Sequence, residues 1–349
     1  GTDLLISIDQ EGGSVARLTT GVSVSPGNMG LGATKNPQLV EEVAAIMGEE
    51  LRAVGFNVNL APCVDVNNNP LNPVIGVRSY GSEPSLVGEL GKAAIKGFQR
   101  HLLATAKHFP GHGDTNVDSH LSMPIITHDW ERLSAVELPP FEQAIAAGVE
   151  VILAAHVLFP AIPECNPRLP ATLSHNVLTK LLREKLGFTG LIFTDCMEME
   201  AITKQYSMGE AAVLAIEAGV DMVLISHTPE RQSEAYWAVI DAVKSGRISM
   251  ERIEESYARV KKAKETLAKM ENEPRTIGSQ AHFEVMRQTV RESLTVVQDR
   301  GNLPLQQQEF VVIETRAQAT SIAEEKINDA QGLADYLRGA GFRVQGEKI

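Results

Sequence analysis

The stretch Leu102-Leu-Ala-Thr-Ala-Lys-His-Phe-Pro-Gly-His-Gly-Asp-Thr-Asn-Val-Asp-Ser-His120 joins an apolar run to a loop crowded with titratable side chains. The run 102–106 suits a buried strand, whereas residues 107–120 contain three histidines, two aspartates and a lysine. Proline and glycine interrupt this loop, so it contributes little to a core. Loops mounted on rigid strands are where catalytic groups commonly lie. The stretch therefore predicts a strand whose carboxyl end opens into a functional site.

Short apolar runs and longer amphipathic patterns alternate on both sides of this stretch. The runs predict strands at residues 4–8, 56–60, 103–108, 149–155, 190–194 and 222–226. The patterns between them predict helices at residues 37–54, 86–101, 133–147, 178–186 and 208–218. Such alternation is typical of parallel strands joined by crossover helices. It predicts an α/β fold for the first three quarters of the chain.

Polar residues at the strand ends decide between the two architectures that fit this alternation. A doubly wound sheet gathers them near one switch point, whereas a barrel delivers them from every strand to one face. Each of the six predicted strands ends in, or is followed by, a polar residue: Asp9, Asp65, Lys107 with His108, His156, Asp195 and His227. We therefore predict a (β/α)8 TIM-type barrel, with its first βα unit upstream of residue 1.

The rest of the chain predicts the start of a second domain. A charged helical pattern at residues 249–267 closes the barrel domain, which we assign to residues 1–270, and residues 271–308 are assigned to a linker. A strand at 310–314, a helix at 319–339 and a strand-like run at 341–345 follow. They predict that residues 309–349 begin a C-terminal α/β sandwich domain that is incomplete within this sequence.

Composition excludes several classes of function. The formal net charge of −12 argues against nucleic acid as a partner, because phosphate binding relies on clustered Lys and Arg. No apolar run approaches the roughly 18 residues of a membrane span. Cys63, Cys165 and Cys196 have no metal-ligand spacing, and their odd number does not suggest a disulfide framework. The oligomeric state and any upstream signal peptide stay open.

Asp195 is the strongest carboxylate candidate. It ends the predicted strand in Gly190-Leu-Ile-Phe-Thr-Asp-Cys-Met-Glu-Met199. A carboxylate there is costly to bury unless it is hydrogen-bonded or functional. It could cap the next helix or take part in catalysis. The histidine loop, expected on the same face of the barrel, favours the catalytic interpretation.

Six motifs together carry a family resemblance. They are Asp9-Gln-Glu-Gly-Gly13, Arg78-Ser-Tyr-Gly81, Lys107-His-Phe-Pro-Gly-His-Gly-Asp-Thr115, Asp118-Ser-His120, Pro170-Ala-Thr-Leu-Ser174 and Thr194-Asp-Cys-Met-Glu-Met199. In this order they resemble the signature of glycoside hydrolase family 3, in its β-N-acetylglucosaminidase (NagZ-like) branch. Ser14 departs from the family pattern, because the family has arginine there, and this puts loop packing or the pairing of Glu11 in doubt.

The resemblance implies a retaining mechanism with a covalent glycosyl-enzyme intermediate. Asp195 is then the nucleophile, His120 the general acid and later the base, and Asp118 its orienting partner. The chemistry is sound, because an imidazole with an ordinary pKa of about 6.5 exchanges a proton near neutrality and a neighbouring carboxylate fixes its tautomer. The residues expected to bind the sugar are Asp9, Arg78, Lys107, His108 and His156. His112 is expected to shape the loop, and His227 is the weakest candidate.

The implied activity is that of an exo-β-N-acetylglucosaminidase acting on peptidoglycan fragments or chitooligosaccharides. No metal or organic cofactor is implied. The resemblance favours a secreted or cell-wall-associated enzyme of a Gram-positive-like bacterium, with a cytoplasmic location as the alternative.

Four alternatives to this function compete for the same residues. Phosphate could replace water as the acceptor, and the family also includes β-glucosidases. His108 and His112 have the spacing of a helical metal pair, but Pro110 and the adjacent glycines argue against a helix and hence against a metal-dependent hydrolase. A sugar-binding module without catalysis leaves the strand-end Asp195 and the Asp118–His120 pair without a purpose.

Overall fold

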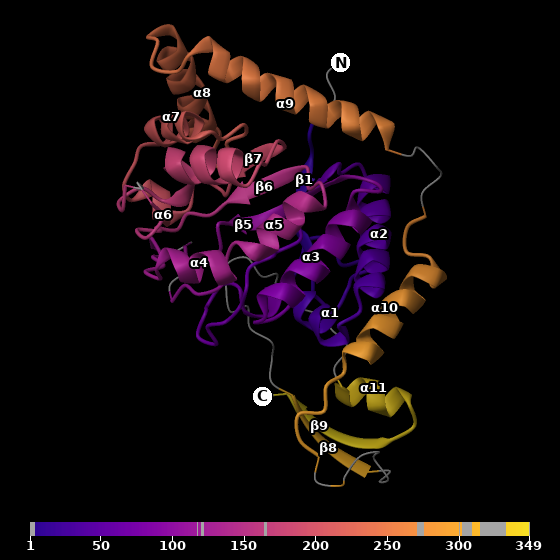
Figure 1. The fold of residues 1–349 in the computed structure, drawn as a ribbon. Coiled ribbons are helices and arrows are strands. Elements are labelled where there is room, and N and C mark those ends of the chain that lie inside the picture. Colours follow the sequence, from indigo (N-terminus) through magenta and orange to yellow (C-terminus); the bar gives the residue numbers. More distant parts are fainter. Residues whose placement is uncertain are drawn as a thin grey trace.

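The computed structural model describes residues 4–116, 118–119, 122–163, 166–270, 276–299, 301, 309–314 and 333–348. Its centre is a curled parallel sheet with strand order β1-β4-β5-β6-β7 (Figure 1). These strands are β1 (Ser7–Ile8), β4 (Val58–Asn59), β5 (Leu103–Phe109), β6 (Val151–Ala154) and β7 (Leu191–Thr194). The order along the sheet follows the order along the chain, so the predicted α/β class with crossover connections is confirmed.

The sixth predicted strand, residues 222–226, runs beside β7 through a few backbone contacts. A parallel bridge joins Phe193 to Met222, and the Met197 N–H donates to the Leu224 carbonyl at 2.9 Å. Register between the longer strands is regular, with Thr105 opposite Val151 and Val151 opposite Leu191. The strand ends predicted to carry polar residues therefore reach the same edge of the sheet.

Helices surround this sheet (Figure 1). In chain order they are α1 (Asn28–Thr34), α2 (Pro37–Ala53), α3 (Pro84–Phe98), α4 (Trp130–Val136), α5 (Pro139–Ala146), the π-helical segment Asn176–Lys185, α6 (Glu200–Thr203), α7 (Met208–Ala218), α8 (Pro229–Lys244) and α9 (Met250–Lys269). Short 3-10 turns lie at Gly76–Arg78 and Ala171–Leu173, and β2 (Gln10–Gly12) pairs with β3 (Val15–Ala16) in antiparallel fashion.

Local sequence explains where these helices begin and end. Asn36 caps α2 by accepting from the Leu39 N–H, and Pro37 occupies the first turn, where its missing N–H is not needed. Gly219 ends α7 with φ of 118°, a left-handed conformation that favours glycine. The single helix predicted at 133–147 is wrong: it is two helices, α4 and α5, because the pair Pro139–Pro140 cannot continue the first and starts the second.

Two apolar clusters lie on the two faces of the sheet. The outer cluster packs the helices on the strands and includes Phe98, Phe109 and Phe141. The inner cluster lies inside the curl and consists of Val58, Leu60, Leu103, Val151, Leu153, Leu191, Phe193, Ala263 and Leu267. The last two belong to α9, so this helix covers the inner cluster at the end opposite the polar residues. The polar strand ends are left as the open face.

The predicted linker region contains a helix, α10 (Gln280–Ser293), that contacts α1 and α2. The Thr276 N–H donates to Glu49, and Gly278 N–H and His282 Nδ1 both reach Glu50 Oε1, at 2.9 and 2.8 Å. Beyond it, β8 (Glu309–Glu314) pairs in parallel with β9 (Arg343–Lys348), and α11 (Leu333–Gly339) lies between them in sequence. This is the predicted βαβ order; residues 319–332 of the predicted helix lie outside the described residues, and the domain boundaries stay a prediction. Among the described helices, none is long and apolar enough to cross a membrane.

Candidate active site

The carboxyl ends of the strands surround a cleft of about 490 Å³. Five of the predicted site residues line it: Asp9, Arg78, Lys107, His108 and Asp195. They come from four different segments, spread over almost two hundred residues of sequence. His120 lies outside the described residues. His112, Ser119, Cys196, Glu198 and His227 also line the cleft.

Glu11 binds two cations at the base of the cleft. Its carboxylate accepts from Arg78 Nε and Nη2 at 2.9 and 2.7 Å, and Lys107 Nζ lies 2.7 Å from its Oε1. All three side chains are almost fully buried. Burial alone would raise the pKa of Glu11, but Arg78 and Lys107 outweigh it and hold that pKa far below its usual range. Lys107 also donates to Asp9 Oδ1 at 2.7 Å, so the cluster joins two predicted sugar-binding residues.

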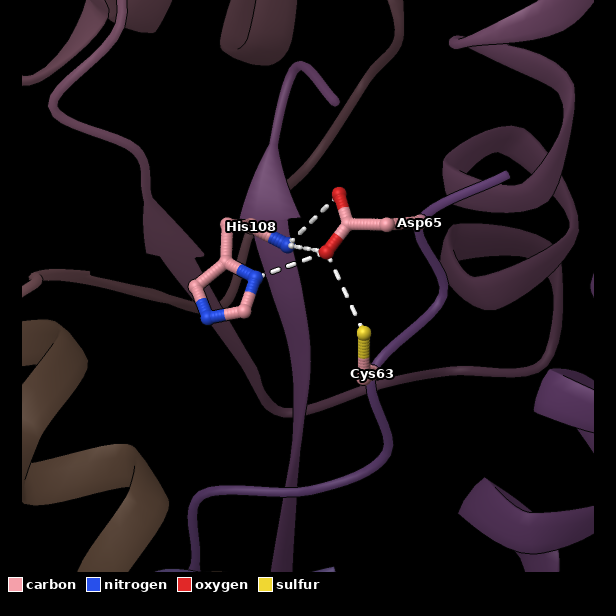
Figure 2. Close-up of side chains that lie close together, drawn as sticks. All are labelled: Cys63, Asp65 and His108. Atoms are coloured by element: carbon pink, nitrogen blue, oxygen red, sulfur yellow. Dashed lines mark hydrogen bonds and ion pairs between the residues drawn. The ribbon is translucent and has the colours of Figure 1, made fainter. Parts of the chain in front are cut away.

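Asp65 hydrogen-bonds His108 at the start of the histidine loop (Figure 2). Its carboxylate accepts from His108 Nδ1 at 2.7 Å, from the His112 N–H at 2.7 Å and from the Cys63 thiol at 3.1 Å. Burial opposes the charge of Asp65, yet His108 and the other donors outweigh burial and lower its pKa to about 2. Asp65 is therefore an ionised hydrogen-bond acceptor that fixes the orientation of His108.

The tautomer of His108 follows from its neighbours. Arg78 Nη2 lies 3.3 Å from His108 Nε2 and can only donate, so Nε2 presents a lone pair. The proton then lies on Nδ1 and points to Asp65. The Arg78 contact thus fixes the tautomer of His108. The arrangement leaves an acceptor nitrogen at the wall of the cleft.

Asp195 stands at the end of β7 with one oxygen fixed and the other open. Oδ1 accepts from the Cys196 N–H at 2.7 Å. Burial raises the pKa of Asp195, but His108, His156, this N–H and Lys107 together outweigh it and lower the pKa below its ordinary value. No described residue hydrogen-bonds Oδ2. The carboxylate is thus ionised, oriented and accessible from the cleft.

His156 lies behind Asp195 and outside the cleft lining. It is 1% exposed, its Nε2 donates to the Cys196 carbonyl at 3.0 Å, and its Nδ1 lies 2.8 Å from Thr172 Oγ1. The ring therefore holds the turn that follows Asp195. Thr172 belongs to the predicted motif at residues 170–174, which in this way packs against the Asp195 turn.

His112 hydrogen-bonds Ser119, which lies between Asp118 and His120 in the sequence. The Thr115 hydroxyl donates its proton to the His112 carbonyl at 3.1 Å, so its oxygen can only accept from His112 Nδ1. His112 Nδ1 therefore carries the ring proton, and Nε2 accepts from the Ser119 hydroxyl at 3.0 Å. Burial is the largest cause that lowers the pKa of His112 to about 4, which keeps the ring neutral. Gly113 lets the loop approach closely, because a Cβ there would lie 1.8 Å from the Val66 carbonyl oxygen.

Three further residues bear on the sequence predictions. Asp118 is 7% exposed and lies outside the cleft lining. Asp114, farther along the same loop, pairs with His128 and Arg132. The Ser14 hydroxyl, at the position where the motif departs, is buried and has no hydrogen-bond partner among the described residues. Glu11 is nevertheless fully paired, because Arg78 and Lys107 supply its partners.

The sequence prediction missed the roles of Glu11 and Asp65. Both were visible as acidic residues near strand ends, and Glu11 lies within the first motif. Their partners are 67 and 43 residues away along the chain, so no local pattern shows that each carboxylate orients a cleft residue.

Comparison with known proteins identifies the family. Residues 1–263 match the glycosyl hydrolase family 3 N terminal domain. The chain belongs to this family. Beta-hexosaminidase A of Pseudoalteromonas piscicida is 37% identical over 335 residues, which are 88% of this chain and 56% of that protein. A beta-hexosaminidase of Nitrosomonas eutropha is 37% identical over 238 residues, covering 66% of this chain and 67% of that protein. This family 3 chain thus spans little more than half of the first relative.

Two solved structures share the fold. A β-N-acetylglucosaminidase from Paenibacillus sp. str. FPU-7 has a TM-score of 0.92 and 47% identity, covering 99% of this chain and 67% of that one. The β-glucoside phosphorylase BglX, bound to 2FGlc, has a TM-score of 0.87 and 26% identity, covering 98% of this chain and 65% of that one. The predicted family and its barrel-type α/β fold are confirmed.

Proposed function

We propose that this chain is the catalytic part of a retaining exo-β-N-acetylglucosaminidase that removes terminal GlcNAc from peptidoglycan fragments or chitooligosaccharides. Asp195 attacks the anomeric carbon and forms a covalent glycosyl-enzyme intermediate. His120, oriented by Asp118, protonates the leaving oxygen and then deprotonates the incoming water. The observation that carries the proposal is Asp195, ionised and open at Oδ2 in a cleft ringed by polar strand ends.

Sugar binding is assigned to the residues that line the cleft. Asp9 accepts hydrogen bonds from hydroxyl groups, and Arg78 and Lys107 donate to them. His108 Nε2 accepts from a hydroxyl, since its proton is directed to Asp65. Because Glu11 and Asp65 hold these side chains from behind, they do not have to be ordered when the sugar binds. His156 supports the same subsite through the Cys196 carbonyl rather than by touching sugar.

The names of the relatives support this substrate. Two of the matching proteins are named beta-hexosaminidases, and a solved structure with 47% identity is described as a β-N-acetylglucosaminidase. The chain's motif Asp118-Ser-His120 supports a histidine as acid/base in place of a second carboxyl group. It disfavours β-glucosidase activity, which stays the alternative within the family.

Phosphorolysis is the second candidate, because BglX, a β-glucoside phosphorylase, has the same fold over 98% of this chain. A histidine acid/base repels an anionic acceptor less than a carboxylate does. Against it, four carboxylates and three cations line this cleft, namely Asp9, Asp195, Glu198 and Glu200 with Arg17, Arg78 and Lys107. A cleft in which carboxylates outnumber lysine and arginine side chains does not attract phosphate, so water is the proposed acceptor.

Rates of p-nitrophenol release from the β-N-acetylglucosaminide and the β-glucoside, with and without phosphate, test the proposal. The acetamido sugar should be strongly preferred, and phosphate should not accelerate release. Asp195→Ala should abolish turnover on every substrate, whereas His120→Ala should lose less on aryl glycosides with good leaving groups. Equal losses on activated and unactivated substrates would rule out His120 as the acid, and preference for glucose would overturn the assigned substrate.

A further inference from the structure

A second group of polar side chains lies in the same cleft, beside Asp195. Ligand atoms of Cys196, Glu198 and His227 all lie within 4.8 Å of one another, and all three residues line the cleft. Cys196 and Glu198 follow β7, and His227 follows the neighbouring segment 222–226. The two segments are joined by the Met197–Leu224 backbone hydrogen bond of 2.9 Å. Three different donor types, sulfur, oxygen and nitrogen, are thus presented from one connected framework.

The buried trio Cys63, Asp65 and His108 has a similar composition but different chemistry (Figure 2). The Cys63 thiol is fully buried, and burial followed by the charge of Asp65 raises its pKa well above normal. That thiol donates to Asp65, whose oxygens are already occupied by His108 and His112. This trio is a closed hydrogen-bond network and has no capacity for an ion.

The cleft trio has that capacity. Among the described residues, none hydrogen-bonds the Cys196 thiol or the His227 ring. The Glu198 carboxylate is anchored through Oε2, which accepts from the backbone N–H groups of His227 and Thr228 at 2.6 and 3.3 Å. Its Oε1 accepts from Arg231 Nη1 over a long distance of 3.5 Å. One oxygen is therefore held in place while the other can bind a ligand.

We propose that Cys196, Glu198 and His227 bind a zinc-class divalent metal ion, with water as the fourth ligand. Zinc prefers four ligands drawn from thiolate, imidazole and carboxylate at bond lengths of about 2.0–2.3 Å, which places ligand atoms roughly 3.5 Å apart. The atoms here need to close by only about an ångström. On binding, the Cys196 thiol releases its proton to solvent and the thiolate sulfur donates its electron pair to the metal. Magnesium, which favours oxygen ligands, does not fit this set.

The consequence is inhibition by the metal. Cys196 directly follows Asp195, so an ion held by its sulfur occupies the cleft next to the carboxylate that must reach the sugar. This inhibitory step rests on the proposed function, whereas metal binding does not. It also differs from a metal-dependent mechanism, because removal of the ion should restore the enzyme.

Cobalt(II) titration of the full chain tests the site without using activity. Co²⁺ bound to a thiolate gives a charge-transfer absorption band, and Zn²⁺ should displace it. The band should be lost in Cys196→Ser, and affinity should fall about tenfold or more in His227→Asn, since even outer-shell changes cost this much at metal sites. His175→Asn is the matched control, because His175 is exposed and lies outside the cleft lining. A wild-type protein without the band, or a band that survives Cys196→Ser, would overturn the site.

Inhibition is then measured as the ratio of rates in zinc and in chelator, within each variant. The wild type and His175→Asn should be strongly inhibited by Zn²⁺ and unaffected by Mg²⁺, whereas Cys196→Ser should lose most of its sensitivity. Affinity should rise as the pH rises, because a proton is released on binding. Cobalt binding without inhibition would overturn the blocking step alone. Absence of turnover in metal-free wild type would instead refute the proposed function, while the absorption band still decides the site.

Discussion

Asp65→Asn removes one buried negative charge while keeping the side-chain shape. In the folded chain the pKa of Asp65 is lowered from 3.8 to about 2, because His108 and its other donors outweigh the effect of burial. A difference of that size corresponds to about 2.5 kcal/mol of stability at neutral pH. Because the folded pKa is the lower one, this contribution is present above pH 3.8 and is lost as the pH falls toward 2. The variant should therefore be less stable at pH 7 by at least about 2 kcal/mol, and the difference should shrink in acid.

Urea unfolding followed by circular dichroism at pH 7, 5, 4 and 3 measures this dependence. Asp241→Asn is the matched control, because Asp241 is 76% exposed and its nearest cation, Lys244, lies 4.0 Å away. The control should change stability by less than about 0.5 kcal/mol at every pH. The reasoning fails if Asp65→Asn equals the wild type at pH 7, or if its deficit at pH 3 is as large as at pH 7. Either result would mean that the buried carboxylate gains nothing from its donors.

Three further predictions concern the same cleft. Glu11→Gln should destabilise the protein by about 3 kcal/mol, since it leaves the buried Arg78 without its anion and Lys107 with Asp9 alone, and it should weaken substrate binding. Glu41→Gln, which breaks an exposed pair, should cost less than about 1 kcal/mol in the same urea assay. The pKa of His112 is lowered from 6.5 to about 4 in the folded chain. The free energy of unfolding of the wild type should therefore fall by about 3 kcal/mol as the pH falls from 6.5 to 4, and His112→Asn should reduce this pH dependence. Chelator should not reduce turnover of p-nitrophenyl substrate, and a loss restored by added metal would show that the chain is a metal-dependent hydrolase.

The fold class could be predicted because strands buried on both faces are apolar along their whole length. That signal located all six strand segments. It could not give the length of each ladder: β1 and β4 pair over two residues each, although the apolar runs predict five. An apolar run records burial, whereas ladder length depends on how neighbouring strands tilt. The break between α4 and α5 could have been predicted from Pro139 and Pro140. It was missed because the amphipathic pattern continues across these prolines.

The cleft residues could be predicted as far as strand ends determine position. Asp9, Lys107, His108 and Asp195 each follow an apolar run, and a parallel sheet brings such positions to one edge. The position of Arg78 could not be predicted in this way, because it does not follow a strand. From sequence, Arg78 was predicted as a sugar contact; in the structure it forms a buried ion pair and also lines the cleft. That outcome depends on Glu11, which is 67 residues away.

The arrangement of charges explains how Asp195 can be both ionised and reactive. Lys107 and Arg78 are each bound to a carboxylate behind them, and among the described residues no lysine or arginine forms an ion pair with Asp195. Its ionised form is favoured instead by more distant groups and by a single N–H on Oδ1. A direct ion pair would also lower its pKa, but it would occupy the oxygen that has to attack. Because Glu11, which pairs with both cations, is buried at the base of the cleft, Lys107 still favours the ionised form of Asp195 while Oδ2 stays open. This is the arrangement that a nucleophilic carboxylate requires, and it gives Glu11 a reason to be buried where it is.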